Sequence, residues 1–252
     1  MKVALLGGTG LLGRRVARAL AQERIDHTIA GRSAEGPNTF AIDLITGQGV
    51  PEAIADCDTV MLLASNPAKP RKVDVEGTRR LLPLLEGRHL VYISIVGVDR
   101  HPYSYYEAKY EAEQMIAASV ENYSILRATQ FHDLLVFRIA RLARRWPYCL
   151  VRSGFVYQPV DAGEVAQHLV DVAKSGPAGM LPDMAGPEII DIKTLARTYM
   201  TAIGRERPVV GVYVPGRVAS AFRRGLHTNP DRAVGRKTWE QHLEPLRQVI
   251  PR

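Results

Sequence analysis

The chain has only two cysteines among its 252 residues, Cys57 and Cys149. They lie far apart in the sequence and match neither a metal-ligand spacing nor a disulfide framework. We therefore expect no metal site. Scarce cysteine also favours a reducing compartment, so we expect a cytoplasmic protein.

Long hydrophobic runs are also missing, because no stretch of about 18 apolar residues occurs and no membrane span is expected. The short apolar run at 3–6 ends in glycines, which predicts a first strand rather than a signal peptide. The net charge of +7 is mild for this length. Arginines gather at 138–152, which predicts a basic amphipathic helix whose charged face is exposed to solvent. Alternatively, this basic face could bind an anionic substrate, an acidic partner or a membrane surface. Nucleic-acid binding needs a larger basic footprint and is not expected.

Short apolar runs alternate with helical patterns over the first half of the chain. Buried parallel strands read as continuous apolar stretches because helices cover both faces of their sheet. The expected strands are 2–6, 27–30, 59–63, 89–95 and, more weakly, 123–126, and the expected helices are 11–22, 74–85 and 105–118. This alternation predicts an α/β fold with a doubly wound parallel sheet.

The pattern changes after about residue 131. Helices are expected at 134–145, 162–174 and 192–203, a short strand at 209–214, and a Gly/Pro-rich stretch at 175–188, with a basic and less regular end. We expect a nucleotide-binding core at 1–175, parts of 128–160 lining a substrate pocket, and a smaller C-terminal substrate lobe at 176–252.

The segment GGTGLLG at 7–13 joins the first strand to the first helix. Gly7 permits a tight turn, Gly10 lets the backbone approach a pyrophosphate, and Gly13 permits close packing of helix on strand. The helix N-terminus adds unpaired N–H groups and a partial positive charge. The context predicts a dinucleotide site of the Rossmann type. Contacts in this turn are also expected from Thr9, Leu11 and Leu12.

The second strand ends in Gly31-Arg32-Ser33 and has no acidic residue that would bind the adenosine ribose hydroxyls. Arg32 with Ser33 suits a 2′-phosphate, so NADP is favoured and NAD remains possible. Asp43 and Leu44 follow the next apolar stretch and are expected near the adenine. Asp43 could alternatively cap a turn.

Ser94 lies at the end of the expected strand 89–95, where α/β sheets bind their ligands. Tyr105 and Lys109 are four residues apart and share a helix face. A nearby ammonium favours the phenolate, which brings the tyrosine closer to neutral-pH acid–base work. Ser94 would hold a carbonyl while Tyr105 transfers a proton. Tyr106 is also within one turn of Lys109 and is an alternative acid.

These segments together resemble the atypical or extended short-chain dehydrogenase/reductases, on the NmrA-like side of that superfamily. The resemblance is carried by GGTGLLG at 7–13, GRS at 31–33, LAS at 63–65, VDVEGT at 73–78, Ser94, Tyr105 with Lys109, LRATQFHD at 126–133 and QPVDAGEVA at 158–166. It implies a Rossmann core, a nicotinamide cofactor contacted also by Ala64, Ser65 and Lys109, and a pocket roofed by the C-terminal lobe. Ser94, Tyr105 and Lys109 match the family's catalytic serine, tyrosine and lysine.

Gln130, Phe131 and His132 follow the expected strand 123–126 and are candidate substrate contacts, although a histidine is more often a structural hydrogen-bonding group. The sequence thus predicts an NADP(H)-dependent oxidoreductase acting on a small carbonyl, quinone or conjugated molecule. Two alternatives stay open: an NADP(H)-sensing regulatory protein without turnover, and a nucleotide-sugar epimerase or dehydratase. Neither the substrate nor the oligomeric state follows from the sequence.

Overall fold

The computed structural model describes every residue except 34, 145–146, 206 and 248–252. The chain divides into two compact units that alternate along the sequence. Unit 1 comprises Met1–Asp99, Tyr103–Arg127 and Ala162–Pro182, and unit 2 comprises Arg100–Pro102, Ala128–Asp161 and Asp183–Arg252. The division expected from the sequence, a nucleotide-binding core at 1–175 and a substrate lobe at 176–252, assigns functions to two segments. It stays a proposal.

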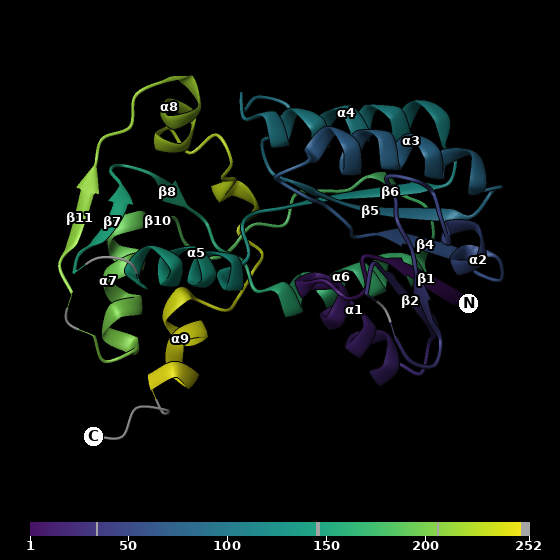
Figure 1. Ribbon diagram of the computed structural model, residues 1–252, viewed down its shortest axis with the longest axis horizontal. Helices are drawn as coiled ribbons and strands as arrows, with labels where there is room; N and C mark the ends of the chain where they lie inside the picture. The colour runs from purple at the N-terminus through teal and green to yellow at the C-terminus, as the bar shows by residue number, and fades with distance from the viewer. Residues whose placement is uncertain (34, 145–146, 206, 248–252) are drawn as a thin grey trace. The chain divides into compact units, whose positions relative to one another are not determined.

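Unit 1 is built on a seven-stranded parallel sheet (Figure 1). Its strands are β1 (Lys2–Leu6), β2 (Asp26–Gly31), β3 (Thr39–Ala41), β4 (Thr59–Leu62), β5 (His89–Ile95), β6 (Tyr123–Ala128) and β9 (Gly179–Met180), in the spatial order β3-β2-β1-β4-β5-β6-β9. All four residues of β4 are buried, because the strand lies between β1 and β5 with helices over the sheet. The doubly wound α/β fold and all five expected strands are confirmed.

Helices cover both faces of this sheet, with α1 and α6 on one face and α3 and α4 on the other (Figure 1). The helical segments of unit 1 are α1 (Leu11–Gln22), α2 (Val50–Ile54), η1 (Arg71–Glu76), α3 (Gly77–Leu81), η2 (Leu82–Leu84), α4 (Ser104–Ser119) and α6 (Ala162–Ser175). The single helix expected at 74–85 is divided into a π-helical turn, α3 and a 3₁₀ turn. Pro83 accounts for the last break, because it lacks the amide hydrogen that would continue the α-helical hydrogen bonds.

Unit 2 combines helices with two small two-stranded sheets. Its elements are α5 (His132–Arg144), β7 (Cys149–Arg152), β8 (Val156–Tyr157), β10 (Ile190–Asp191), α7 (Ile192–Ala202), β11 (Val209–Val212), α8 (Arg217–Arg223), η3 (Pro230–Arg232) and α9 (Trp239–Arg247). The β8–β10 pair is antiparallel and the β7–β11 pair is parallel. Arg145, at the end of the expected helix 134–145, lies outside the described residues.

The C-terminal region is more regular than the sequence pattern indicates, because it forms α8 and α9. In α9, Trp239 and Leu243 lie four residues apart and are both buried. Such spacing places them on one helix face. Pro245 lies inside α9, and because proline normally ends a helix, the sequence pattern does not predict a helix here.

The excess positive charge of the protein belongs to unit 2. Its sequence has 18 Lys and Arg against 9 Asp and Glu, whereas unit 1 has 15 against 17.

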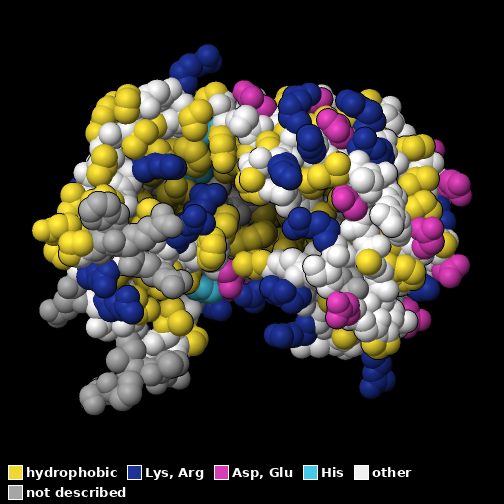
Figure 2. Space-filling model, in the orientation of Figure 1, with side chains coloured by type: hydrophobic (Ala, Val, Ile, Leu, Met, Phe, Trp, Pro, Cys, Tyr) yellow, Lys and Arg dark blue, Asp and Glu magenta, His cyan; other side chains and the backbone are white. Residues whose placement is uncertain are grey.

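Hydrophobic side chains are also exposed around β7 and β11, including Leu150, Val210 and Val212 (Figure 2). Among the described residues, no helix has the length and apolarity needed to cross a membrane. Cys57 and Cys149 are both free and buried.

Candidate functional site

The turn between β1 and α1 can be built only with glycine at two positions. Gly7 has a φ of 97°, and a Cβ there would lie 2.5 Å from the backbone nitrogen of Ala64. A Cβ on Gly13 would lie 2.3 Å from the carbonyl oxygen of Gly7. Both distances are far below a normal contact, so the first turn of α1 packs directly against the preceding loop.

The start of α1 leaves backbone amides available for an anion. The first intrahelical bond runs from the amide of Arg14 to the carbonyl of Gly10, and no side chain caps Gly10. The amides of Leu11, Leu12 and Gly13 therefore precede the hydrogen-bond ladder. Gly10 is exposed, and a Cβ there would meet only the carbonyl of Gly7, at 3.1 Å. This bare backbone at a helix N-terminus fits a pyrophosphate group.

Two glycine-to-alanine variants separate the roles of this turn. Gly13→Ala should destabilise the fold and weaken NADPH binding, because its Cβ would overlap the backbone of Gly7 and Gly8. Gly10→Ala should change unfolding free energy by less than about 1 kcal/mol but weaken NADPH binding about tenfold or more. Chemical denaturation and isothermal titration measure the two effects. Equal NADPH affinity in Gly10→Ala would contradict the phosphate contact.

The end of β2 lies beside the glycine turn. A Cβ on Gly31 would lie 2.4 Å from Oγ1 of Thr9, so Thr9 packs against the end of this strand. Arg32 and Ser33 follow and are both exposed. Within the described part of the chain, Arg32 makes neither an ion pair nor a hydrogen bond, so its guanidinium is available to a ligand.

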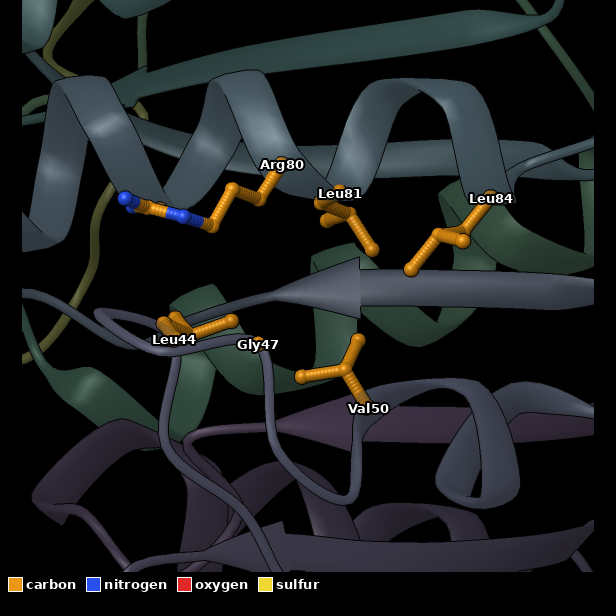
Figure 3. A pocket seen from close by; sticks show the side chains of 7 residues that line it. Leu44, Gly47, Val50, Arg80, Leu81 and Leu84 are labelled. Atoms are coloured by element: carbon orange, nitrogen blue, oxygen red, sulfur yellow. The ribbon is translucent and has the colours of Figure 1, made fainter.

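Asp43 and Leu44 lie beyond β3 and have structural roles. Oδ1 of Asp43 accepts a hydrogen bond from the amide of Ile45 at 2.7 Å, which is the turn-capping arrangement. Leu44 is buried and lines a small apolar hollow with Val50 and Leu81 (Figure 3). The hollow has a volume of about 10 Å³, roughly the space of one water molecule. A contact of either residue with adenine stays a prediction.

A chain of polar groups begins at Tyr105 on α4. The Tyr105 hydroxyl lies 2.8 Å from Oγ of Ser65, and Ser65 donates to Oδ1 of Asp74 at 2.6 Å. Because the single Ser65 hydrogen is used toward Asp74, the Tyr105 hydroxyl is the donor to Ser65. Lys109 Nζ lies 3.8 Å from the same Asp74 oxygen. The connection between Tyr105 and Lys109 therefore passes through Ser65 and Asp74.

Lys109 is a buried cation, with 2% of its surface exposed. Its ammonium donates to the carbonyl of Ile93 at 2.7 Å and lies 3.9 Å from the centre of the Tyr92 ring. Burial lowers the pKa of Lys109 to about 8, against the opposing effects of Asp74 and Glu113. The protonated and neutral forms are therefore both accessible near neutral pH.

Asp74 was not predicted as a site residue, although it lies in the VDVEGT segment at 73–78. It is 2% exposed, and a carboxylate this deep in the protein is usually paired. Its partners come from Ser65 and Lys109, which lie 9 and 35 residues away. No local spacing links these three residues, so sequence periodicity could not identify the group.

Ser94 and Tyr106 are two further residues with predicted roles in catalysis. Ser94, on β5, is buried, and its Oγ has no hydrogen-bond partner among the described residues. Buried hydroxyls are normally bonded, so Ser94 Oγ is available to a bound molecule. Tyr106 is 4% exposed and packs against the rings of Tyr103 and Tyr105. Of the two tyrosines, Tyr105 is the one whose hydroxyl forms a hydrogen bond with Ser65.

The candidate substrate residues Gln130, Phe131 and His132 belong to unit 2. Gln130 is buried and its backbone carbonyl accepts from the amide of Val160 at 3.0 Å, while Phe131 is half-buried. His132 is fully buried, and burial, followed by the neighbouring His242, lowers its pKa to about 4. His132 is therefore a neutral imidazole near pH 7.

The sequence matches a model of NAD(P)H-binding proteins over residues 7–135, just over half of the chain. This region includes the glycine turn, Arg32 and the Tyr105–Lys109 chain. Sequence comparison with curated proteins finds no significant match.

Solved structures share the fold over nearly the whole chain. An NADPH-dependent quinone oxidoreductase from Escherichia coli, complexed with NADPH, superimposes with a TM-score of 0.79 at 15% identity, covering 98% of this chain and 99% of that one. A nucleoside-diphosphate-sugar epimerase from Staphylococcus aureus gives 0.76 at 18% identity, over 97% and 100%. A short-chain dehydrogenase/reductase superfamily protein from Agrobacterium tumefaciens with bound NAD gives 0.73 at 19%, over 98% and 96%. The chain belongs to the NAD(P)H-binding family and has a Rossmann-type fold.

Proposed function

We propose that the protein is an NADP(H)-dependent oxidoreductase that reduces a small carbonyl, quinone or conjugated substrate, or catalyses the reverse reaction. The observation that carries this proposal is the Tyr105–Ser65–Asp74–Lys109 chain. It lies close to the glycine turn, since Ser65 directly follows Ala64, whose backbone lies against Gly7. An acid–base group beside a dinucleotide site is the arrangement that hydride-transfer chemistry needs.

The glycine turn and the end of β2 would hold the cofactor. The pyrophosphate would lie at the amides of Leu11–Gly13, over the bare backbone of Gly10. Arg32 and Ser33 would bind the 2′-phosphate, which distinguishes NADP(H) from NAD(H). When bound, the nicotinamide supplies or accepts a hydride.

Proton transfer would be performed by Tyr105. A carbonyl oxygen that gains negative charge would take the Tyr105 proton, and the phenolate would recover it from the Ser65 hydroxyl. Ser65 would be reprotonated through Asp74 from Lys109, whose pKa of about 8 lets it give up a proton near neutrality and take one back from solvent before the next turnover. Before it gives up its proton, the Lys109 ammonium would also favour the negative charge left on Tyr105.

Ser94 would orient the substrate. Its buried hydroxyl has no described partner, so a hydrogen bond to a substrate oxygen costs no existing bond of that group. Gln130, Phe131 and His132 are proposed substrate contacts. The proposed division of labour assigns the cofactor to residues 1–175 and substrate selection to 128–160 and 176–252.

The cofactor preference is tested at Arg32. Arg32→Asp should raise the Kd for NADPH by about 10- to 100-fold and leave the Kd for NADH within about threefold, because only NADPH has the 2′-phosphate. Arg18→Asp, on the exposed face of α1, makes the same charge change and controls for long-range electrostatics. Isothermal titration measures both constants. An unchanged ratio of the two affinities in Arg32→Asp would contradict the role of Arg32.

Turnover is tested with NADPH and a panel of aldehydes, ketones and quinones, followed by the loss of NADPH absorbance. The proposal expects NADPH consumption with at least one acceptor class. Tight NADPH binding without turnover on the whole panel would instead favour a sensing role. The same protein preparation serves both measurements, so a failure to fold is separated from a failure to react.

A further inference from the structure

A cluster of three potential metal ligands lies within unit 2. His132 begins α5, Asp161 precedes α6, and His242 lies on α9. One potential ligand atom from each residue lies within 4.8 Å of those of the other two. The residues are 29 and 81 positions apart, so no sequence motif links them.

His132 has an unusual environment for a buried histidine. Its side chain is 0% exposed, and neither ring nitrogen has a hydrogen-bond partner among the described residues. Buried ring nitrogens are normally bonded, and an unpartnered pair points to a missing water or ion. The His242 ring stacks on His132 with centroids 4.8 Å apart, and His242 Nδ1 lies 3.9 Å from Oδ2 of Asp161.

We propose that His132, Asp161 and His242 bind a zinc ion, with a water molecule as fourth ligand. Two imidazole nitrogens and one carboxylate oxygen form a common zinc ligand set, whereas Mg²⁺ and Ca²⁺ prefer oxygen alone. Tetrahedral zinc places its ligand atoms about 3.4 Å apart. The cluster therefore needs side-chain rotations that bring ligand atoms now up to 4.8 Å apart about 1.4 Å closer together. One imidazole must also turn out of the present stack, whose ring planes differ by only 16°, because a bound metal lies in the plane of each ligating ring.

Lys237 takes the place of a cation at Asp161 when metal is absent. Its Nζ lies 3.2 Å from Oδ2 of Asp161 and competes with a metal for the same oxygen. The Lys237 side chain is 40% exposed, so it can turn into solvent when zinc binds. Zinc would then connect the C-terminal helix α9 with the start of α5. His132 would then be a zinc ligand and not a substrate contact, and the ion would stabilise the packing of unit 2.

The test is titration of ZnCl₂ into the full-length protein after chelation, with one bound zinc per chain expected. Cobalt substitution should give the visible absorption of a four-coordinate site. His242→Gln and Asp161→Asn should each weaken zinc binding by about 100-fold or more, because each removes a ligand. Lys237→Met should instead tighten binding by about tenfold, because it removes the competing ammonium.

His227→Gln is the matched control for loss of a buried histidine. His227 lies in the same unit and is 0% exposed, with Nε2 bonded to the carbonyl of Val156 at 2.9 Å, outside the cluster. This variant should keep full zinc affinity, and circular dichroism checks that each variant is folded. Less than one tenth of a zinc per chain would overturn the site. Equal affinity in folded His242→Gln, or no tightening in Lys237→Met, would do so as well.

Discussion

Replacing Tyr105 with Phe is expected to reduce the rate of NADPH-dependent turnover by about 10²- to 10⁴-fold, which is the usual contribution of a positioned general acid. The variant removes the hydroxyl that donates to Ser65 and leaves the ring in place. The glycine turn is untouched, so the Kd for NADPH should stay within about threefold. Stopped-flow kinetics with saturating NADPH, together with isothermal titration, separate the two effects.

Tyr106→Phe is the matched control for Tyr105. Tyr106 is the next residue on α4 but is buried, and its ring packs against Tyr103 and Tyr105. This variant should change turnover by less than about threefold. If Tyr106→Phe abolished turnover while Tyr105→Phe did not, Tyr106 would be the acid. Unchanged rates in both variants would remove tyrosine from the proposed proton transfer.

Replacing Asp74 with Asn should lower the free energy of unfolding by about 3–5 kcal/mol at pH 7, the largest loss of stability that we predict for a single substitution. Asn has the shape of Asp but no charge, so the ammonium of Lys109 would remain buried without its ion-pair partner. Urea unfolding measures the free energy. The double variant Asp74→Asn with Lys109→Met removes both charges and should be more stable than Asp74→Asn alone.

The effect of Asp74→Asn should depend on pH in a defined direction. Lys109 has a pKa of about 8 in the folded protein, below its ordinary value of 10.5, because it is buried. The unfolded chain therefore binds more protons between these values, and the Lys109 contribution to stability rises with pH across that window. Asp74 raises the pKa of Lys109, so Asp74→Asn lowers it further and extends the window to lower pH.

The stability difference between the unmodified protein and Asp74→Asn should consequently shrink between pH 7 and pH 9.5. At the higher pH, Lys109 is mostly neutral in both folded proteins, and the missing carboxylate costs less. A difference that stays constant over this range would show that Lys109 does not titrate as its burial implies. A difference that grows with pH would show that Asp74 does not raise the pKa of Lys109.

Local order along the chain is enough to predict several parts of the protein. The glycine turn follows directly from a buried strand, three spaced glycines and an amphipathic helix, and the expected helix 11–22 matches α1 at both ends. The five main strands were recognisable because strands covered on both faces are apolar throughout. The π and 3₁₀ turns around α3, by contrast, interrupt a helical pattern that side-chain periodicity predicted as one helix.

The contacts between polar groups that are distant in the sequence depend on how the chain packs on itself. The sequence spacing pairs Tyr105 directly with Lys109, whereas the fold inserts Ser65 and Asp74 between them. The association of His132, Asp161 and His242 likewise depends on where α5 and α9 pack within unit 2. Periodicity reports which face of a helix or strand is buried, but it contains no information on what that face meets. Packing of the chain on itself supplies that information, and with it the partners of Lys109 and His132.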